Sequence, residues 1–287
     1  MKFGLAFSNV GPFVQPDEAR FLATSAEEAG LESLWTVEHV AVPAGYQAQY
    51  PYSKDGKMPG GEDSPIPDPL LWLAYVAAAT SRIRLATGIL ILPQRHPIYT
   101  AKEAATLDVL SGGRAILGVG IGWLEEEFRA LGLPFDERAS RTEECCAALR
   151  ALWGEGAQPF KGEHYAWEPV ESNPKPVQAG GVPIVVGGHV LGAARRAARV
   201  GDGFFPLKAE GGRLGDLLAA MGEECARVGR DPEKIEITTA LPGNDLDAIR
   251  RLEDQGVSRL VMGPPGFTRD DVRRGLGEFA DNVIARL

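Results

Sequence analysis

Two histidines lie where apolar, strand-like runs of the sequence come to an end. His39 follows Glu38 just beyond one such run, and His189 follows a pair of glycines beyond another. An imidazole ring can give or take a proton near neutral pH, which suits it to general acid–base chemistry. We therefore assign His39, together with the adjoining Glu38, as the candidate catalytic residues.

Three of the four histidines, His39, His96 and His189, are expected at the same end of one sheet, which raises the question of a metal site. Metal-dependent hydrolases bind their metal through grouped histidines with carboxylate support. Here each histidine stands alone, so we assign no metal ligand. A metal-dependent hydrolase is kept as the alternative enzyme class, and a ligand-binding protein without turnover as the non-enzyme alternative. A structural hydrogen bond is the simpler interpretation of His96 and His189.

Glycines cluster beside two further apolar runs. Gly118, Gly120 and Gly122 are spaced like the start of the dinucleotide fingerprint G-x-G-x-x-G, but its third glycine would fall at Trp123. The pattern therefore argues against a Rossmann site. Because glycine has no Cβ, these positions let a flat or phosphorylated ligand approach the backbone closely, unless they serve only tight turns.

The pair Gly187-Gly188 precedes a predicted helix over residues 191–200. The free N–H groups and the dipole at the start of a helix both favour an anion. No lysine or arginine lies within this turn. Arg138 and Arg141, at the start of another predicted helix, either add positive charge to it or serve as solvated surface residues. The glycine pair is thus the candidate phosphate site.

These residues need a scaffold that brings strand ends together, and the hydrophobic periodicity predicts one. Strand-like runs alternate with helix-like patterns along the whole chain. The strand-like runs are residues 2–7, 33–36, 83–92, 115–119, 183–186, 203–207, 235–239 and 259–262. The helix-like patterns are residues 16–29, 68–80, 97–110, 139–153, 191–200, 214–228, 246–252 and 272–283, with a short one at 124–131.

Such alternation implies parallel strands joined by right-handed crossovers, and eight units close naturally into a (β/α)8 TIM barrel. We therefore predict one α/β barrel domain over residues 1–287, with the active site at the C-terminal ends of the strands. A doubly wound open sheet is the competing architecture.

Two insertions interrupt the alternation. Residues 40–67 follow the second strand, and residues 154–182 precede the fifth and contain a hairpin-like stretch at 160–167. Long loops in compact domains are usually functional, although a solvated insertion is the plainer alternative. The first insertion can overhang the site, whereas the second lies at the opposite end unless it folds over the barrel wall. Their aromatic residues either line an apolar pocket or simply pack the loops: Tyr46, Tyr50, Tyr52, Tyr165 and Trp167.

Charge and composition narrow the class further. The chain has 287 residues, with 30 basic against 39 acidic side chains and a formal net charge of −9. A nucleic-acid binder would carry a basic stripe instead. The three cysteines form neither a zinc spacing nor a disulfide framework, and no apolar run has the length of a membrane span or a signal peptide. We expect a cytoplasmic protein with neither a nucleic-acid nor a membrane partner.

An ordered series of short motifs runs along nearly the whole chain: Lys2–Phe7, Trp35-Thr36-Val37-Glu38-His39, Arg84-Leu85-Ala86-Thr87-Gly88, His96-Pro97, Ser111-Gly112-Gly113-Arg114, Gly118-Val119-Gly120-Ile121-Gly122-Trp123, Glu137-Arg138 with Arg141-Thr142-Glu143, Pro174-Lys175-Pro176, and Pro183-Ile184 with Gly187-Gly188. Single motifs of this kind are weak, but their order is specific. The series resembles the bacterial luciferase-like flavin and deazaflavin oxidoreductases.

The resemblance implies a β/α barrel that binds a flavin or deazaflavin over the C-terminal end of its strands. Glu38 and His39 would border the ring, and a bulge with a non-proline cis peptide at Gly88-Ile89 would lie behind it. Gly187 and Gly188 would hold the phosphate. The full set of expected cofactor contacts is Asn9, Thr87, Gly88, Ile89, Gly120, Gly122, Arg141, Gly187, Gly188 and His189.

The resemblance also implies an activity. The chain is similar to the branch that uses the 5-deazaflavin coenzyme F-420 (F420), in which a hydride passes between the deazaflavin and a small organic substrate. An FMN-dependent monooxygenase is the alternative within the family. A homodimer is implied as well, with the alanine-rich helical segments 73–80 and 101–106 as candidate contact faces.

Overall fold

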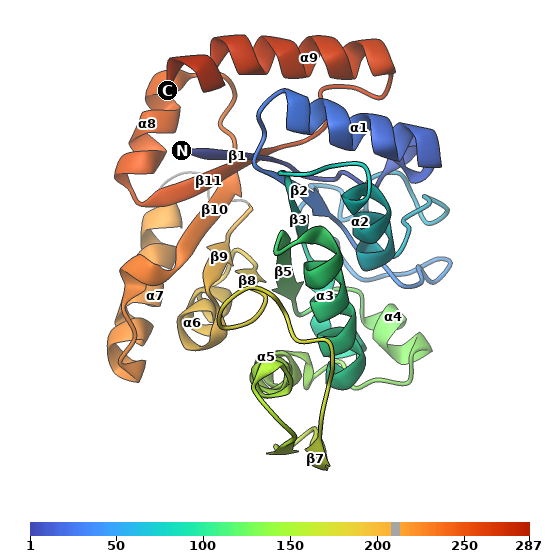
Figure 1. Cartoon of the computed structure of the whole chain (residues 1–287), viewed down its shortest axis with the longest axis vertical. Helices are drawn as coiled ribbons and strands as arrows, with labels where there is room; N and C mark the ends of the chain where they lie inside the picture. The colour runs from blue at the N-terminus through green and yellow to red at the C-terminus, as the bar shows by residue number, and fades with distance from the viewer. Residues whose placement is uncertain (208–212) are drawn as a thin grey trace.

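The computed structural model describes residues 1–207 and 213–287, and its strands form a closed parallel barrel (Figure 1). The order around the barrel is β1-β2-β3-β5-β8-β9-β10-β11, and β11 pairs with β1 to close it. The barrel strands are β1 (Lys2–Leu5), β2 (Ser33–Thr36), β3 (Arg84–Thr87), β5 (Ala115–Gly120), β8 (Ile184–Gly187), β9 (Gly203–Phe205), β10 (Glu236–Ala240) and β11 (Val257–Met262). The predicted (β/α)8 TIM barrel is confirmed.

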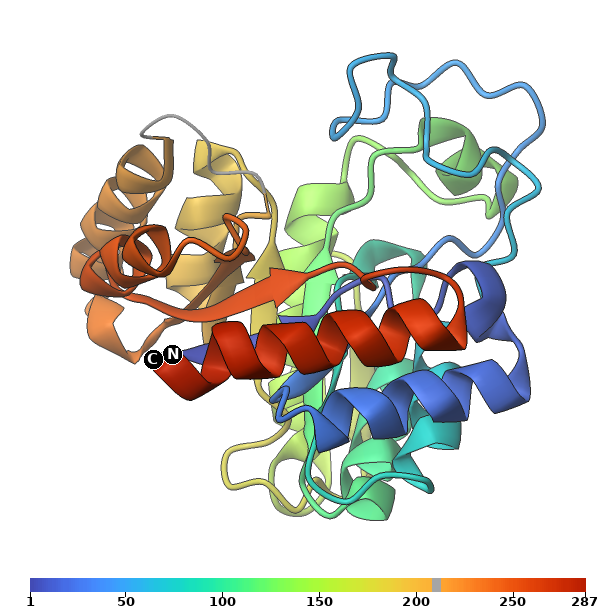
Figure 2. The ribbon, with the colours of Figure 1, turned by 90° about the horizontal axis from the view of Figure 1, so that it is seen from above.

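Helices surround the barrel and connect successive strands (Figures 1 and 2). They are α1 (Pro16–Glu28), α2 (Pro69–Ala77), α3 (Pro97–Ser111), α4 (Glu125–Ala130), α5 (Arg138–Trp153), α6 (Leu191–Val200), α7 (Arg213–Val228), α8 (Leu246–Asp254) and α9 (Arg269–Asn282). Short 3-10 turns lie at Gly11–Val14, Leu92–Gln94, Pro232–Lys234 and Ile284–Arg286. Across the described ranges, no helix combines the length and apolarity needed to cross a bilayer.

The predicted strand over residues 83–92 is interrupted. After β3 the chain bulges at Gly88-Ile89, whose peptide bond is cis, as the family resemblance implied. Pairing then resumes in β4 (Leu90–Ile91), where Leu90 lies opposite Val119 and Ile91 opposite Gly120 of β5. The bulge therefore lies at the C-terminal end of the barrel, between two stretches of regular pairing.

The barrel interior is apolar at mid-height and charged toward its N-terminal end. A separate apolar cluster fills the interior around Trp35 and Phe205, whose rings meet edge-on with centroids 5.1 Å apart. Nearby, the Arg259 side chain is fully buried and pairs with Glu32 at 2.9 Å and with Glu236 at 3.2 Å. A buried guanidinium is tolerated only when such partners compensate it. Burial alone would raise the pKa of Glu32, but Arg259 outweighs that effect and the pKa lies below its ordinary value.

The two insertions occupy different places. Residues 40–67 rise beside α4 in Figure 2 (light blue, upper right). The second insertion forms the predicted hairpin, with β6 (Gln158–Lys161) paired to β7 (Ala166–Val170). Its tip returns to α5, where Glu144 accepts hydrogen bonds from the amides of residues 163–165. The hairpin therefore folds along the outer wall of the barrel.

The segments that we proposed as dimer faces are largely turned inward. Leu73, Val76, Ala101 and Ala105 are fully buried in the core, so these faces are not free to contact a second copy. The homodimer stays a prediction, and the exposed apolar side chains of α2 and α3 are now its better candidates: Leu71, Tyr75, Tyr99 and Leu110.

We expect Arg259→Met to lower the free energy of unfolding by roughly 3 kcal/mol, because it leaves Glu32 without its ion-pair partner and Glu236 with Lys2 alone. Urea denaturation measures the loss, and Arg250→Met, which removes an exposed pair with Asp247, is the matched control at about 0–1 kcal/mol. The wild-type advantage should shrink below about pH 4, as the carboxyl groups become protonated. Equal losses in the two variants would contradict this role of Arg259.

Candidate active site

His39 lies three residues beyond the C-terminal end of β2, as predicted, and its ring is held on two sides. Its Nδ1 is 3.0 Å from Oε2 of Glu127 in α4, and its side chain is only 8% exposed. The edge of Trp123 packs against the imidazole, with ring centroids 5.6 Å apart. A cleft of about 340 Å³ opens beside it, lined by Glu38, His39, Val40, Ile66, Asp68, Pro69, Gln94 and Arg95.

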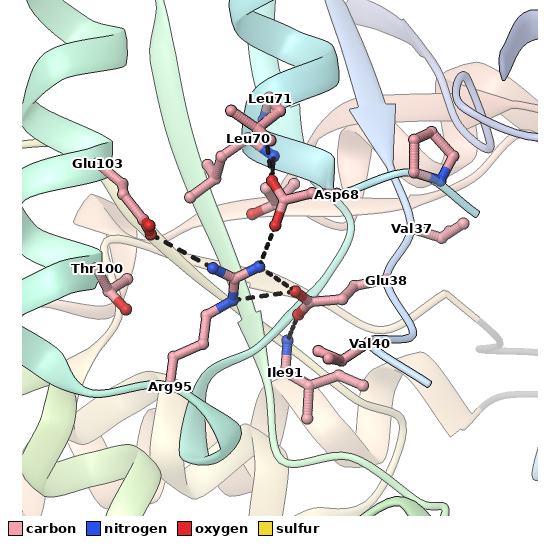
Figure 3. A network of polar contacts seen from close by, with 12 residues as sticks. Val37, Glu38, Val40, Asp68, Leu70, Leu71, Ile91, Arg95, Thr100 and Glu103 are labelled. Carbon is pink, nitrogen blue, oxygen red and sulfur yellow. Dashed lines mark hydrogen bonds and ion pairs between the residues drawn. The ribbon is translucent and has the colours of Figure 1, made fainter. Parts of the chain in front are cut away.

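The Glu38 carboxylate forms an ion pair with Arg95 (Figure 3). Its Oε1 accepts hydrogen bonds from Nε and Nη2 of Arg95 at 3.0 and 2.5 Å, and its Oε2 accepts one from the Ile91 amide at 2.5 Å. Burial raises the pKa of this carboxyl, although Arg95 opposes the shift. Both oxygens are thus occupied. These contacts give Glu38 a structural role, and its expected catalytic role stays a prediction.

Arg95 also joins the two ends of the first insertion (Figure 3). Besides Glu38, its guanidinium contacts Asp68 at 2.6 Å and Glu103 of α3 at 3.3 Å. Asp68 in turn accepts hydrogen bonds from the amides of Leu70 and Leu71 at the start of α2, both at 2.9 Å. Sequence reasoning missed Arg95, because nothing in local spacing relates it to carboxylates so far away along the chain.

The insertion over residues 40–67, which we call the roof, covers this end of the barrel with aromatic side chains. Tyr46 and Tyr50 both pack edge-on against Trp123, with centroids 5.6 and 5.2 Å away. Tyr52 contacts the ring of His189 beyond β8 at 4.8 Å, and burial raises the pKa of Tyr52 to about 12. The insertion thus reaches from the end of β2 to the end of β8.

Helix α4 anchors this roof through two consecutive glutamates. Oε1 of Glu126 accepts hydrogen bonds from the amides of Gln47 and Ala48 at 2.8 and 3.2 Å. The Gln47 amide contributes most to a pKa of Glu126 below its ordinary value. Glu127 likewise accepts the amides of residues 40 and 41, at 2.7 and 3.1 Å. The sequence offers only one hint of these anchors, which is the acidic run at the start of α4.

Asn9 and Thr87 are fully buried and fully engaged with backbone. The Asn9 amide group donates to the carbonyls of Val37 and Pro67 at 2.9 and 3.3 Å and accepts from the Val37 amide at 2.8 Å. The Thr87 hydroxyl donates to the Gly118 carbonyl at 2.6 Å. Both side chains thus form structural hydrogen bonds, and their expected role as cofactor contacts stays a prediction.

Three of the predicted glycines make room for protein side chains. A Cβ on Gly120 or Gly187 would lie 2.6 Å from an atom of Ile89, and one on Gly122 would lie 2.8 Å from Phe128. These positions were assigned to the close approach of a ligand. In the structure their missing Cβ atoms instead let the Gly88-Ile89 bulge and α4 pack against the barrel. Ile89 remains partly exposed.

The turn after β8, where we predicted the phosphate site, leads directly into α6. Gly188 has a φ of +129°, and its own amide donates to the Phe205 carbonyl at 3.2 Å. The cap residue Val190 offers no side-chain hydrogen bond to α6. Within residues 1–207 and 213–287, the amides of Val190, Leu191 and Gly192 have no acceptor, so they are the donors available to an anion.

Arg141 lies at the start of α5, against the hairpin. It pairs with Glu137 at 3.3 Å and stands over the ring of Tyr165 at 5.1 Å, while its Nε is buried without a hydrogen-bond partner. His96 caps α3, with its ring accepting the Ile98 amide at 3.3 Å, as the simpler interpretation expected. The residues that the structure describes contain no group of three His, Cys, Asp or Glu side chains placed to hold a metal ion.

Comparison with known proteins places this site in a family. The family model for luciferase-like monooxygenases matches residues 1–243. The chain belongs to the luciferase-like monooxygenase family. This membership identifies it as an oxidoreductase, and the sequence resemblance is thereby confirmed.

Several known proteins resemble the chain over most of its length. An uncharacterized protein of Mycobacterium tuberculosis is 34% identical over 275 residues, covering 93% of this chain and 94% of the relative. An F420-dependent glucose-6-phosphate dehydrogenase of Kineococcus radiotolerans is 33% identical over 246 residues, covering 83% of this chain and 67% of that protein. A solved F420-dependent secondary alcohol dehydrogenase, in complex with an F420–acetone adduct, has a TM-score of 0.79 at 19% identity over 99% of this chain and 98% of that one, which shows a shared fold.

We expect Asn9→Ala to destabilise this luciferase-like barrel by about 1–3 kcal/mol, because it leaves backbone groups of Val37 and Pro67 without their hydrogen-bond partner. Chemical denaturation measures the change, and alanine at the exposed Asn282 is the control, with an effect within about 0.5 kcal/mol. A variant that keeps full stability yet loses affinity for a flavin or deazaflavin would contradict this structural role and support the predicted cofactor contact of Asn9.

Proposed function

We propose that the chain is an F420-dependent oxidoreductase that moves a hydride between the deazaflavin ring and a small organic substrate. The observation that carries the proposal is the His39 ring, held by Glu127 and Trp123 at the C-terminal end of the barrel beneath an aromatic roof. The F420-dependent relative at 33% identity supports the choice of cofactor. The proposal treats residues 1–287 as one domain, because the barrel closes only when β11 near the C-terminus pairs with β1 near the N-terminus.

The residues present fit an anionic cofactor. The amides of residues 190–192 point out of the uncapped start of α6, and Gly188 brings its turn close to that helix, where a Cβ would lie 2.8 Å from Ala193. Arg141 adds a cation whose Nε is buried and unpaired. These groups would hold the phosphate of the cofactor, and Ile89 would support its ring.

When bound, the deazaflavin supplies the hydride chemistry. His39 would give or take the substrate proton at Nε2, the ring nitrogen that does not face Glu127. Trp123 and the tyrosines of the roof would exclude water from the reacting groups. Glu38 and Arg95 would hold the backbone on which His39 stands.

An FMN-dependent monooxygenase is the second candidate, favoured by the description of the family itself. Both cofactors would present a phosphate to the same turn, so the two candidates differ in the ring. Titration with F420 and with FMN, followed by fluorescence, distinguishes them. Tight binding of FMN with no binding of F420 would overturn the first candidate.

We expect His39→Ala to bind F420 nearly as well as the wild type but to lose roughly 10²–10⁴-fold in turnover, because it removes a positioned proton-transfer group. The F420 absorbance follows turnover, and fluorescence titration follows binding. His96→Ala is the matched control, since that ring caps α3 and packs against Tyr99 and Tyr165, and its turnover should stay near that of the wild type. Unchanged turnover in His39→Ala would refute the role of His39.

We expect Gly192→Asp to weaken cofactor binding at least tenfold relative to Gly192→Asn, which corresponds to about 1.4 kcal/mol. The two side chains have nearly the same shape, and a Cβ at Gly192 meets no other atom within 4 Å, so the pair isolates the negative charge. Equal affinity in the two variants would place the phosphate elsewhere. An aspartate at the start of a helix should not reduce thermal stability.

A further inference from the structure

Glu127 makes contacts that a residue serving only as a loop anchor would not need. Its side chain is fully buried, and its two carboxylate oxygens have different tasks. Oε1 accepts the amides of Val40 and Ala41, the first residues of the roof. Oε2 faces Nδ1 of His39 at 3.0 Å. One carboxylate thus joins the start of the roof to the imidazole.

We propose that Glu127 is the positioning residue of the site, which fixes the proton of the neutral His39 ring on Nδ1 and so leaves Nε2 as the working nitrogen. The inference rests on the proposed function for the catalytic use of His39, but not for the geometry. It assigns to Glu127 a role that neither the roof contacts nor the ion pair of Glu38 supplies.

The physical basis is that an ionised carboxylate can only accept hydrogen bonds. Burial alone would raise the pKa of Glu127, but the His39 ring and the Ala41 amide outweigh it, and the pKa lies below its ordinary value. The carboxylate is therefore charged at neutral pH, and the atom facing it on His39 must be a donor. A neutral imidazole with Nδ1–H has an unprotonated Nε2, which is the form that accepts a proton.

The same contact links the roof to the histidine. Among the contacts of the described residues, Glu126 accepts hydrogen bonds from the amides of residues 47 and 48 and has none with His39. Glu127 binds the amides of residues 40 and 41 and also the His39 ring. Trp123, just before α4, closes the other side of the ring. Movement of the start of the roof would therefore move the carboxylate that orients the imidazole.

Glu127→Gln tests the proposal, with Glu126→Gln as the matched control that also removes one charge from α4. Nitrogen NMR of protein labelled with ¹⁵N-histidine, in the absence of cofactor, reports which ring nitrogen carries the proton. The His39 signals are identified by their absence in His39→Ala. In the wild type we expect the Nδ1–H form. In Glu127→Gln the amide group can donate to Nδ1, so we expect the Nε2–H form.

The expected result for Glu126→Gln is a wild-type His39 spectrum, with any change confined to substrate affinity. Turnover of Glu127→Gln should fall at least tenfold, and its pH–rate profile should shift to lower pH, while the profile of Glu126→Gln stays in place. An Nε2–H ring in the wild type would overturn the proposal, and this measurement needs only His39→Ala, which assigns the signals, to fold. A Glu127→Gln spectrum identical to that of the wild type would also overturn it.

These outcomes separate the positioning role from the proposed function. Full turnover in His39→Ala would refute proton transfer by His39, yet the tautomer measurement would still stand or fall by itself. Conversely, a wild-type tautomer in Glu127→Gln would leave His39 as the proton-transfer group and reduce Glu127 to an anchor of the roof.

Discussion

The pairing of β1 with β11 is the contact on which the rest of the molecule depends. Without it the parallel strands would form an open sheet, and their C-terminal ends would lie in a row along one edge. Closure places those ends around a single opening and encloses an interior that side chains must fill. Trp35 and Phe205 fill its middle, and the fully buried Arg259 lies near its N-terminal end. The opposite end is left for polar groups and glycines.

Ionised carboxylates hold the loops around this barrel. Glu27 accepts the amides of residues 81–83, and these contacts outweigh burial to lower the pKa of Glu27 to about 2. Glu144 likewise accepts hydrogen bonds from the amides of residues 163–165, and Glu127 accepts them from the start of the roof. Backbone amides that leave regular pairing need acceptors, and a carboxylate offers two oxygens at once. Part of the acidic excess of the chain thus has a structural use, which is lost as the carboxyl groups become protonated.

His39 stands between two such anchors. Glu38, the residue before it, is bound by Arg95 and the Ile91 amide. Glu127 binds the His39 ring and the amides of residues 40 and 41. A side chain held in this way needs little reorganisation when a substrate arrives, because its rotamer and its backbone are already ordered. The insertion that follows can therefore be long without loosening the residue from which it begins.

Periodicity by itself determined the alternation of strands and helices. The expected segments 33–36 and 191–200 coincide with β2 and α6, because such patterns are local and repeat along the chain. It also determined that His39 follows a strand end. Only the tertiary structure decided what His39 and Glu38 meet, since Glu127 and Arg95 lie 88 and 57 residues further along. The use of Gly120 and Gly187 was decided in the same way, because the Ile89 side chain that they accommodate comes from the bulge between β3 and β4, and contacts across a closed barrel leave no trace in local spacing.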